Sequence, residues 1–245
     1  MTNAILEVEA VSISLGGLQI LDNVSLTAGR GAITGVIGPN GAGKTTLFNI
    51  VSGFMKPTGG SVHFDGTKLI GMPPEKIAKR GLTRTFQKVR GLPDATVREN
   101  VLIGALNRHS TVSAAEAVVD RLLDELRLDR YRDANAGALP IGLRKRLEVA
   151  RVLAAEPSLV LLDEVMGGLV PSEIEEMMAL IRALADDGIS VILIEHHMKA
   201  VMGLSDHVYV LERGRNLADG PPAEVTRDPA VMTAYLGEGF DHAAH

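Results

Sequence analysis

The chain has 245 residues, a net charge of −5 and no cysteine or tryptophan. At about 150 residues per domain, this length allows one large domain or two small lobes. The lack of cysteine excludes a disulfide framework, a cysteine-ligated zinc site and a thiol nucleophile. The acidic balance and the 3% aromatic content argue against a nucleic-acid binder.

The chain is not expected to cross a membrane. Its longest unbroken apolar run is the five residues 177–181, whereas a membrane-spanning helix needs about 20. The first residues show no basic segment ahead of an apolar core, so no secretory signal is expected either.

The first third of the chain is predicted to consist mostly of strands. Residues 5–13 mix apolar and polar positions in near alternation, as a half-buried strand does. Residues 32–37 form a short apolar run that predicts a buried strand. A helix is predicted from Lys44 to just before Gly53, and residues 61–64 predict an edge strand.

The middle of the chain is predicted to be helical. Ser113 and Glu116 have the spacing of a capping box, and apolar residues follow them at helical spacing. A second helix is predicted to start near Ile141. Because residues 92–154 contain no convincing strand, we expect them to form an inserted helical subdomain. The remaining core would then consist of residues 1–91 and 155–245.

The last third alternates between strand and helix patterns. Residues 159–162 and 191–194 are four-residue apolar runs, which are typical of parallel strands buried on both faces. Between them, a helix is predicted to open at Pro171. Residues 208–211 predict a further strand, and short helices are expected in the tail. The expected fold class is therefore α/β.

Residues 38–46 read GPNGAGKTT, a phosphate-binding pattern between a predicted strand and a predicted helix. The glycines let backbone N–H groups turn toward phosphate oxygens, and the helix N-terminus adds a positive dipole end. Lys44 is expected near the β- and γ-phosphates, and the Thr45 hydroxyl is expected to bind Mg²⁺. The alternative is a glycine-rich turn with an incidental lysine. The predicted binding residues are Gly38, Pro39, Asn40, Gly41, Ala42, Gly43, Lys44, Thr45 and Thr46.

Two acidic residues, Asp163 and Glu164, follow the predicted strand 159–162. The carboxyl ends of parallel strands face the ligand crevice in such sheets. Asp163 is expected to hold Mg²⁺ directly or through water, and Glu164 is expected to polarise the attacking water. A solvated acidic turn is the alternative.

These motifs, together with Gln87 in TRTFQ and His196 in VILIEHH, resemble the nucleotide-binding subunit of ABC transporters over almost the whole chain. The resemblance implies a P-loop NTPase (RecA-like) core with an N-terminal antiparallel β subdomain and an inserted helical subdomain. It implies ATP and Mg²⁺ as cofactors. It also implies that Gln87 contacts Mg²⁺ and the attacking water, and that His196 contacts the γ-phosphate.

The stretches SLGGLQILDNVSL, VMGGLVPSE, ILIEHHM and AYLGE are similar to ATP-binding subunits of branched-chain amino acid importers. That similarity implies a motor subunit peripheral to the cytoplasmic face of the inner membrane. Its implied partners are membrane-spanning permease subunits, a second ATPase subunit in a homo- or heterodimer and, indirectly, a periplasmic substrate-binding protein. Residues 88–100 are expected to dock the permease. The alternatives are a soluble ABC-type ATPase outside transport, or a nucleotide-binding module with weak hydrolysis.

The signature segment, residues 139–143, departs from the family pattern LSGGQ or LSYGQ. In the family, a serine hydroxyl at the second position reaches the γ-phosphate on the opposite subunit, and Pro140 stands there in this chain. Losing a hydrogen bond to a charged oxygen costs about 1.5–3 kcal/mol, so we expect an asymmetric dimer with one weak site. The predicted dimer residues are Leu139, Pro140, Ile141, Gly142, Leu143 and, in the next loop, Gly168.

Further predictions concern Leu15, His197 and the basic triplet 144–146. Leu15 stands where many family members stack an aromatic ring on adenine, which predicts poor base selectivity. His197 follows His196, but shared metal ligation is not expected because neighbouring strand residues point to opposite faces. The basic triplet 144–146 is interpreted either as a solvated face with local packing or as a phosphate or dimer contact.

Overall fold

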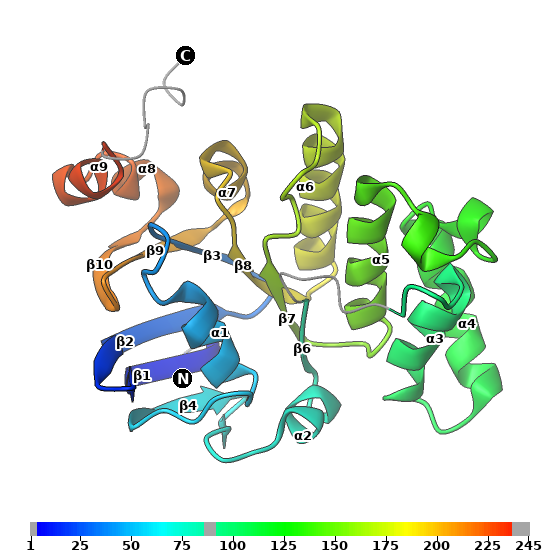
Figure 1. The fold of residues 1–245 in the computed structure, drawn as a ribbon, viewed down its shortest axis with the longest axis horizontal. Helices are drawn as coiled ribbons and strands as arrows, with labels where there is room; N and C mark the ends of the chain where they lie inside the picture. The colour runs from blue at the N-terminus through cyan, green and yellow to red at the C-terminus, as the bar shows by residue number, and fades with distance from the viewer. Residues whose placement is uncertain (1–3, 86–91, 237–245) are drawn as a thin grey trace.

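The computed structural model describes residues 4–85 and 92–236, which form two β-sheets and a layer of helices (Figure 1). The strands are β1 (Ala4–Leu15), β2 (Leu18–Gly29), β3 (Ile33–Ile37), β4 (Gly59–Phe64), β5 (Thr67–Lys68), β6 (Leu82–Arg84), β7 (Leu159–Asp163), β8 (Ser190–Ile194), β9 (His207–Glu212) and β10 (Arg215–Gly220). The helices are α1 (Lys44–Val51), α2 (Pro74–Lys79), α3 (Val97–Leu106), α4 (Val112–Glu125), α5 (Ile141–Leu153), α6 (Pro171–Asp186), α7 (Met198–Leu204), α8 (Pro222–Val225) and α9 (Pro229–Leu236), with short 3-10 turns at Asp129–Tyr131 and Ala136–Ala138.

The N-terminal sheet is antiparallel, with the order β2-β1-β4-β5. The prediction that residues 61–64 form an edge strand is wrong, because β5 pairs with β4 on its outer side. The chain reverses there through Asp65 and Gly66, which have φ of 47° and 70°. Positive φ at both central residues defines the two-residue turn that joins hairpin strands, and Asp-Gly is a preferred pair for it.

The second sheet has the order β10-β9-β3-β8-β7-β6 and is parallel except for β10. Its central strands β3, β7 and β8 are buried along their whole length. Alternate residues face two hydrophobic clusters: Leu159 and Leu161 pack with α1 and the N-terminal sheet, and Val160 and Leu162 pack with the helical layer. Burial on both faces explains why these strands read as unbroken apolar runs.

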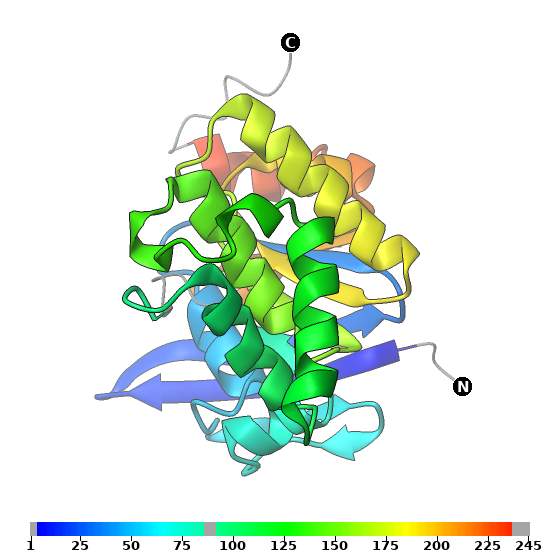
Figure 2. The ribbon, with the colours of Figure 1, turned by 90° about the vertical axis from the view of Figure 1, so that its right-hand side faces the viewer.

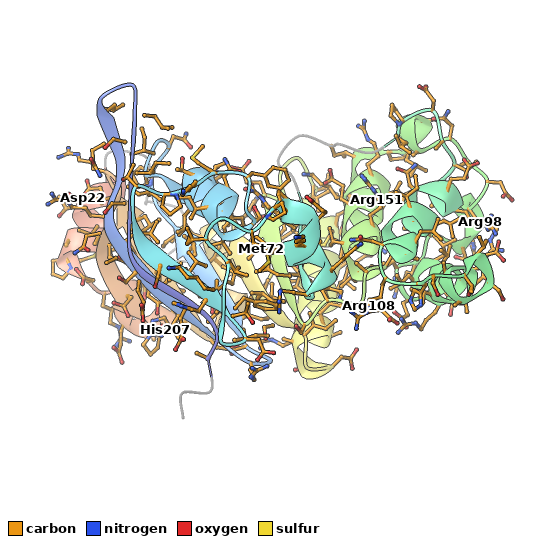
Figure 3. The ribbon with its side chains drawn as sticks, turned by 90° about the horizontal axis from the view of Figure 1, so that it is seen from below. Asp22, Met72, Arg98, Arg108, Arg151 and His207 are labelled. Carbon is orange, nitrogen blue, oxygen red and sulfur yellow. The ribbon has the colours of Figure 1, made fainter. Side chains whose placement is uncertain are left out.

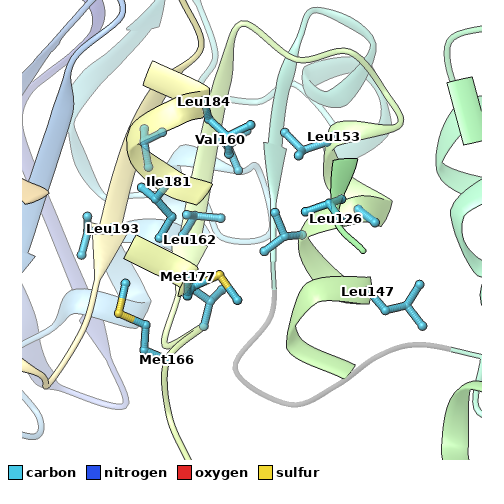
Figure 4. Close-up of a cluster of buried hydrophobic side chains, with 14 of the residues drawn as sticks. Leu126, Leu147, Leu153, Val160, Leu162, Met166, Met177, Ile181, Leu184 and Leu193 are labelled. Carbon is cyan, nitrogen blue, oxygen red and sulfur yellow. The ribbon is translucent and has the colours of Figure 1, made fainter. Parts of the chain in front are cut away.

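Helix α6 packs on the parallel sheet at β8, α5 packs beside β6, and α3 and α4 pack on the outer side of α5 (Figures 1 and 2). Figure 4 shows how this layer meets the sheet: Val160 and Leu162 of β7 lie between Ile181 and Leu184 of α6 on one side and Leu153 of α5 on the other. The inserted helices thus share one continuous hydrophobic cluster with the core. The division of the chain at residues 92 and 154 stays a prediction.

The helical character of residues 92–154 is confirmed, because their regular elements are helices with one isolated bridge. The predicted cap of α4 is wrong, however. Thr111 is the N-cap and accepts a hydrogen bond from the Ala114 N–H (3.4 Å), whereas Glu116 pairs with Arg98. The capping box of this region lies instead at the start of α3, formed by Thr96 and Glu99.

Two elements of the last third were not predicted: α7 and the antiparallel strand β10. The sequence of β10, RNLADG, lacks the apolar alternation of a strand, and its pairing with β9 holds it in place. Within residues 4–85 and 92–236, no helix is long and apolar enough to span a membrane.

Candidate nucleotide-binding site

The phosphate loop follows β3 and is shaped by two glycines. A Cβ at Gly38 would lie 2.1 Å from the Leu211 carbonyl oxygen, so no larger residue fits. Gly43 has φ of 101°, and a Cβ there would lie 2.4 Å from the Leu21 side chain. The loop is therefore pressed against β9 on one side and β2 on the other, which fixes its path.

Lys44 opens α1 and is 6% exposed. Its Nζ donates hydrogen bonds to the carbonyls of Gly38 and Pro39, the latter at 3.1 Å, so the side chain crosses the mouth of the loop. Gly43 is the N-cap of α1 and brings no side-chain hydrogen bond. The first N–H groups of a helix need partners from outside the helix, and an anion is a suitable one. Lys44 and the start of α1 therefore fit a phosphate group.

Asp163 ends β7 and is completely buried. Its Oδ2 accepts a hydrogen bond from Arg84 Nη2 at 2.7 Å, while its Oδ1 is buried with no hydrogen-bond partner among the described residues. Arg84 also donates to Asn49 Oδ1 of α1 (2.7 Å) and lies 5.4 Å from the centre of the Phe48 ring. Arg84 was not predicted as a site residue. The signal that could have found it is a basic residue closing a short buried strand.

The arrangement leaves room for Mg²⁺ at one carboxylate oxygen. Arg84 occupies Oδ2 of Asp163, and Oδ1 remains for a metal-bound water or the metal itself. Thr45 presents its hydroxyl at the exposed start of α1. Carboxylate and hydroxyl oxygens are hard ligands of the kind Mg²⁺ takes, so these two residues fit the ion.

Glu164 and His196 follow β7 and β8, neighbouring parallel strands. His196 Nε2 lies 2.8 Å from Glu164 Oε1, and their side chains are 48% and 22% exposed. Glu164 has a left-handed backbone, with φ of 53°, a conformation that costs a non-glycine residue about 1–2 kcal/mol. The predicted pair is thus brought together at the carboxyl end of the sheet. His197 is the N-cap residue of α7.

Two buried ionisable residues contact the main chain next to this pair. Glu195 is 3% exposed, and its Oε1 accepts a hydrogen bond from the Met166 N–H at 2.7 Å. Burial raises the pKa of Glu195 to about 7, against the lowering effect of the Met166 and His196 N–H groups. Lys145 Nζ donates to the Glu164 carbonyl at 2.9 Å. Glu195 was not predicted as part of the site, and Lys145 was considered only within the basic triplet 144–146.

The basic triplet is not a solvated face. Lys145 is 6% exposed, and it pairs with Glu148 Oε2 at 3.7 Å. Burial raises the pKa of Glu148, and Lys145 opposes that rise. Arg146 forms an ion pair with Glu176 of α6. The triplet therefore ties α5 to its neighbours within the chain.

The signature segment starts α5, with Pro140 as its N-cap. Gly142 is buried, and a Cβ there would lie 2.3 Å from Glu173 Oε1, so the start of α5 packs tightly on α6. A Cβ at Gly168 would lie 3.8 Å from the Ile141 side chain, which is 39% exposed. Ile141 and Gly168 are thus side by side. Leu139 is buried, and Leu143 is half-buried.

Of the two remaining predicted residues, Gln87 is outside the described residues. Leu15 lies at the tip of the β1–β2 hairpin and is 45% exposed, opposite Leu18, which is 67% exposed. The hairpin carries Ile20 and Leu21, which border Gly43 of the phosphate loop.

A parallel sheet with a phosphate loop after one central strand and an acidic pair after another defines a P-loop nucleoside triphosphatase. Within that class, residues 21–167 match the family model described as ABC transporter. Residues 215–241 match the model described as branched-chain amino acid ATP-binding cassette transporter. The chain belongs to the ABC transporter family, as an ATP-binding cassette with ATPase chemistry.

Curated relatives and solved structures agree with this assignment. The high-affinity branched-chain amino acid transport ATP-binding protein BraF of Pseudomonas aeruginosa is 40% identical, over 97% of this chain and 100% of its own. The protein of the same description named LivG, from Escherichia coli, is 39% identical over 97% and 100%. The crystal structure of an ATP-binding cassette of an ABC transporter in its ADP conformation has a TM-score of 0.87 and 32% identity, covering 97% of this chain and 100% of that one. The predicted family and fold class are thereby confirmed.

Proposed function

We propose that the chain is the ATP-hydrolysing subunit of an importer for branched-chain or related amino acids. The observation that carries the chemistry is the Glu164–His196 pair, 2.8 Å apart, on the same sheet edge as the phosphate loop. The strands β3, β8 and β7 are parallel neighbours, so their carboxyl ends converge on one crevice. The substrate class rests on BraF and LivG, whose names state branched-chain amino acid transport.

The residues divide the reaction among them. Lys44 and the N–H groups at the start of α1 hold the phosphates of ATP. Asp163 and Thr45 hold Mg²⁺, which when bound neutralises charge on the β- and γ-phosphates. Glu164 orients the attacking water and accepts its proton. His196 contacts the γ-phosphate and holds the Glu164 carboxylate, while Gln87 completes the water and metal contacts.

Permease subunits dock in a groove of about 560 Å³ between α2, α3 and α5. Phe54, Ile103 and Leu106 line it and are 52%, 49% and 43% exposed, respectively. Large apolar side chains gathered on a surface mark an interaction site. Figure 3 shows Arg151 and Met72 on the two sides of this region. A short segment of a membrane subunit with an apolar face is the occupant.

The chain works peripherally at the cytoplasmic face of the inner membrane, with a second ATPase subunit and, indirectly, a periplasmic binding protein. In a head-to-tail dimer the signature segment meets the partner's nucleotide. The exposed Ile141 beside Gly168 supports an interface on this face. A second candidate, a binding module with weak hydrolysis, is favoured only by Pro140 in the signature segment.

The test combines hydrolysis, binding and association. The chain is produced with permease subunits and a second ATPase subunit from its own organism, and Glu164→Gln is compared with the native chain. The variant should bind Mg²⁺–ATP but lose more than about 100-fold in turnover. The native complex should drive uptake of leucine, isoleucine or valine into proteoliposomes. Turnover unaffected by Glu164→Gln would refute the catalytic assignment, and failure to co-purify with membrane subunits would refute the transport role.

A further inference from the structure

Lys145 connects the signature helix α5 to the segment that carries Glu164, and in a dimer these two parts would act on different nucleotides. It lies in the first turns of α5, four residues after Ile141, where the signature segment becomes helical. Its Nζ donates a hydrogen bond of 2.9 Å to the main-chain carbonyl of Glu164. The signature segment would face the partner's nucleotide, whereas Glu164 acts on the nucleotide of this chain.

The carbonyl that Lys145 contacts belongs to a strained residue. Glu164 has φ of 53°, and such a conformation persists only where the surroundings fix it. Its N–H donates to the Ile194 carbonyl at 2.9 Å, and its carboxylate meets His196. Two residues later, the Met166 N–H donates to Glu195 at 2.7 Å. Lys145, on α5 of the helical layer, also contacts this segment through the Glu164 carbonyl.

The contact is buried and charged, so it is strong for its size. The side chain of Lys145 is 7% exposed, and Glu148, one turn further along α5, lies 3.7 Å away and balances its charge. Hydrogen bonds that involve an ionised group are roughly twice as strong as neutral ones. A displacement of α5 along or about its axis therefore acts directly on the peptide that aims the Glu164 carboxylate.

We propose that Lys145 is a positioning residue that couples the signature helix α5 to Glu164, so that engagement of the partner's nucleotide orients the carboxylate of this chain's own site. The inference rests on the proposed function, because it takes Glu164 as the base and the dimer as head-to-tail. The contacts of Lys145 are with the Glu164 carbonyl and the Glu148 carboxylate, so its role is to position Glu164.

The experiment uses the complete complex with its permease and second ATPase subunit. Lys145→Met keeps the apolar stem and removes the donor, Lys145→Arg keeps a donor, and Lys68→Met is the matched control at an exposed site on β5. Glu148→Gln tests the ion pair without removing the contact to Glu164. Turnover, the dissociation constant for Mg²⁺–ATP, the Hill coefficient for ATP and the melting temperature are measured for each.

Lys145→Met should lower turnover by about tenfold to a hundredfold, the size of effect expected when a catalytic group is misplaced by about 1 Å. The dissociation constant should stay within about twofold, because the phosphate contacts are untouched. The Hill coefficient should fall toward one, and Lys145→Arg should restore most of the turnover. Glu148→Gln and Lys68→Met should keep native turnover.

Two results would overturn the inference. Turnover of Lys145→Met within about twofold of native would show that the contact positions nothing. An equal loss in Glu148→Gln, with matching losses of stability, would show that Lys145 only balances a buried charge. If Lys145→Met does not fold, the double variant Lys145→Met/Glu148→Gln, which removes the donor and both buried charges, carries the same expectations. Native turnover in Glu164→Gln would instead refute the proposed function, so the two failures are distinguishable.

Discussion

Replacing Glu195 by glutamine should remove a pH dependence of stability that the native chain carries near neutrality. Burial raises the pKa of this carboxyl from 4.5 to about 7, Glu164 adds to the rise, and Lys145 opposes it. The folded state therefore binds a proton that the unfolded state has released between these two values. Stability from this group is fully present below about pH 4.5 and is lost as the pH rises through about 7.

The magnitude follows from the shift. A difference of about 2.5 pKa units, at about 1.4 kcal/mol per unit, gives at most about 3 kcal/mol between pH 5 and pH 8 or above. For a chain of this length, 1 kcal/mol moves the melting temperature by roughly 2–4 °C. Glutamine keeps an oxygen that can accept the Met166 N–H and cannot ionise. Glu195→Gln should therefore match the native chain at pH 5 and melt several degrees higher at pH 8.5.

The assay is thermal unfolding of the nucleotide-free chain from pH 5 to pH 9, followed by circular dichroism. The quantity of interest is the variant-minus-native difference in melting temperature, because it cancels the other titrating groups. Glu125→Gln, at an exposed position of α4, is the control and should give a flat difference. A flat difference for Glu195→Gln as well would refute the reasoning, since it would mean that Glu195 ionises alike in both states.

Three further predictions concern the nucleotide and the dimer. Arg84→Met leaves the Asp163 carboxylate buried without its partner and should lower the unfolding free energy by about 3–5 kcal/mol in denaturant titrations; recovery in the double variant Arg84→Met/Asp163→Leu would tie the loss to the pair. Leu15→Tyr should tighten ATP binding by about threefold to tenfold, from a stacking gain of about 0.5–1.5 kcal/mol; an unchanged dissociation constant would remove Leu15 from the base site. If Pro140 weakens only the partner's site, as proposed, Glu164→Gln should reduce turnover of the complex more than the same change in the second subunit, and equal losses would rule out asymmetry.

The buried strands were predictable because their environment leaves one pattern in the sequence. Residues 159–162 and 191–194 are apolar at every position, since both faces of β7 and β8 are covered. The phosphate loop was predictable for a related reason: Gly38 and Gly43 stand where a Cβ would collide with Leu211 or Leu21. Because only glycine fits at these two positions, the sequence motif predicts the path of the loop.

The N-cap of α4 was not predictable in the same way. Thr111 and Ser113 are both good N-cap residues, and Ser113 has the better-spaced glutamate. The helix starts at Val112, which makes Thr111 its cap, and its buried face begins at Ala115. Tertiary packing thus decided between two local signals of similar strength.

The supporting charges of the site could not be predicted, because each pairs with a residue distant in sequence. Arg84 and Asp163 are 79 residues apart, Glu195 and Met166 are 29 apart, and Lys145 lies 19 residues before Glu164. A charged residue within an apolar stretch indicates a partner but does not say which one. The reacting groups therefore follow from motifs, and the groups that hold them follow only from the fold.

Helix α5 connects the altered signature segment to the segment that carries the Glu164–His196 pair. Its first turn meets Gly168 through Ile141, and Lys145 holds the Glu164 carbonyl. In the proposed head-to-tail dimer Pro140 would deprive the partner's nucleotide of a hydroxyl contact, whereas the Lys145 contact lies within this chain. In such a dimer, the weaker phosphate contact would lie at the partner's nucleotide. The intact Glu164 carboxylate would lie at this chain's own nucleotide. Asymmetry in the complex would then arise from one residue, with no loss of the chain's own hydrolytic groups.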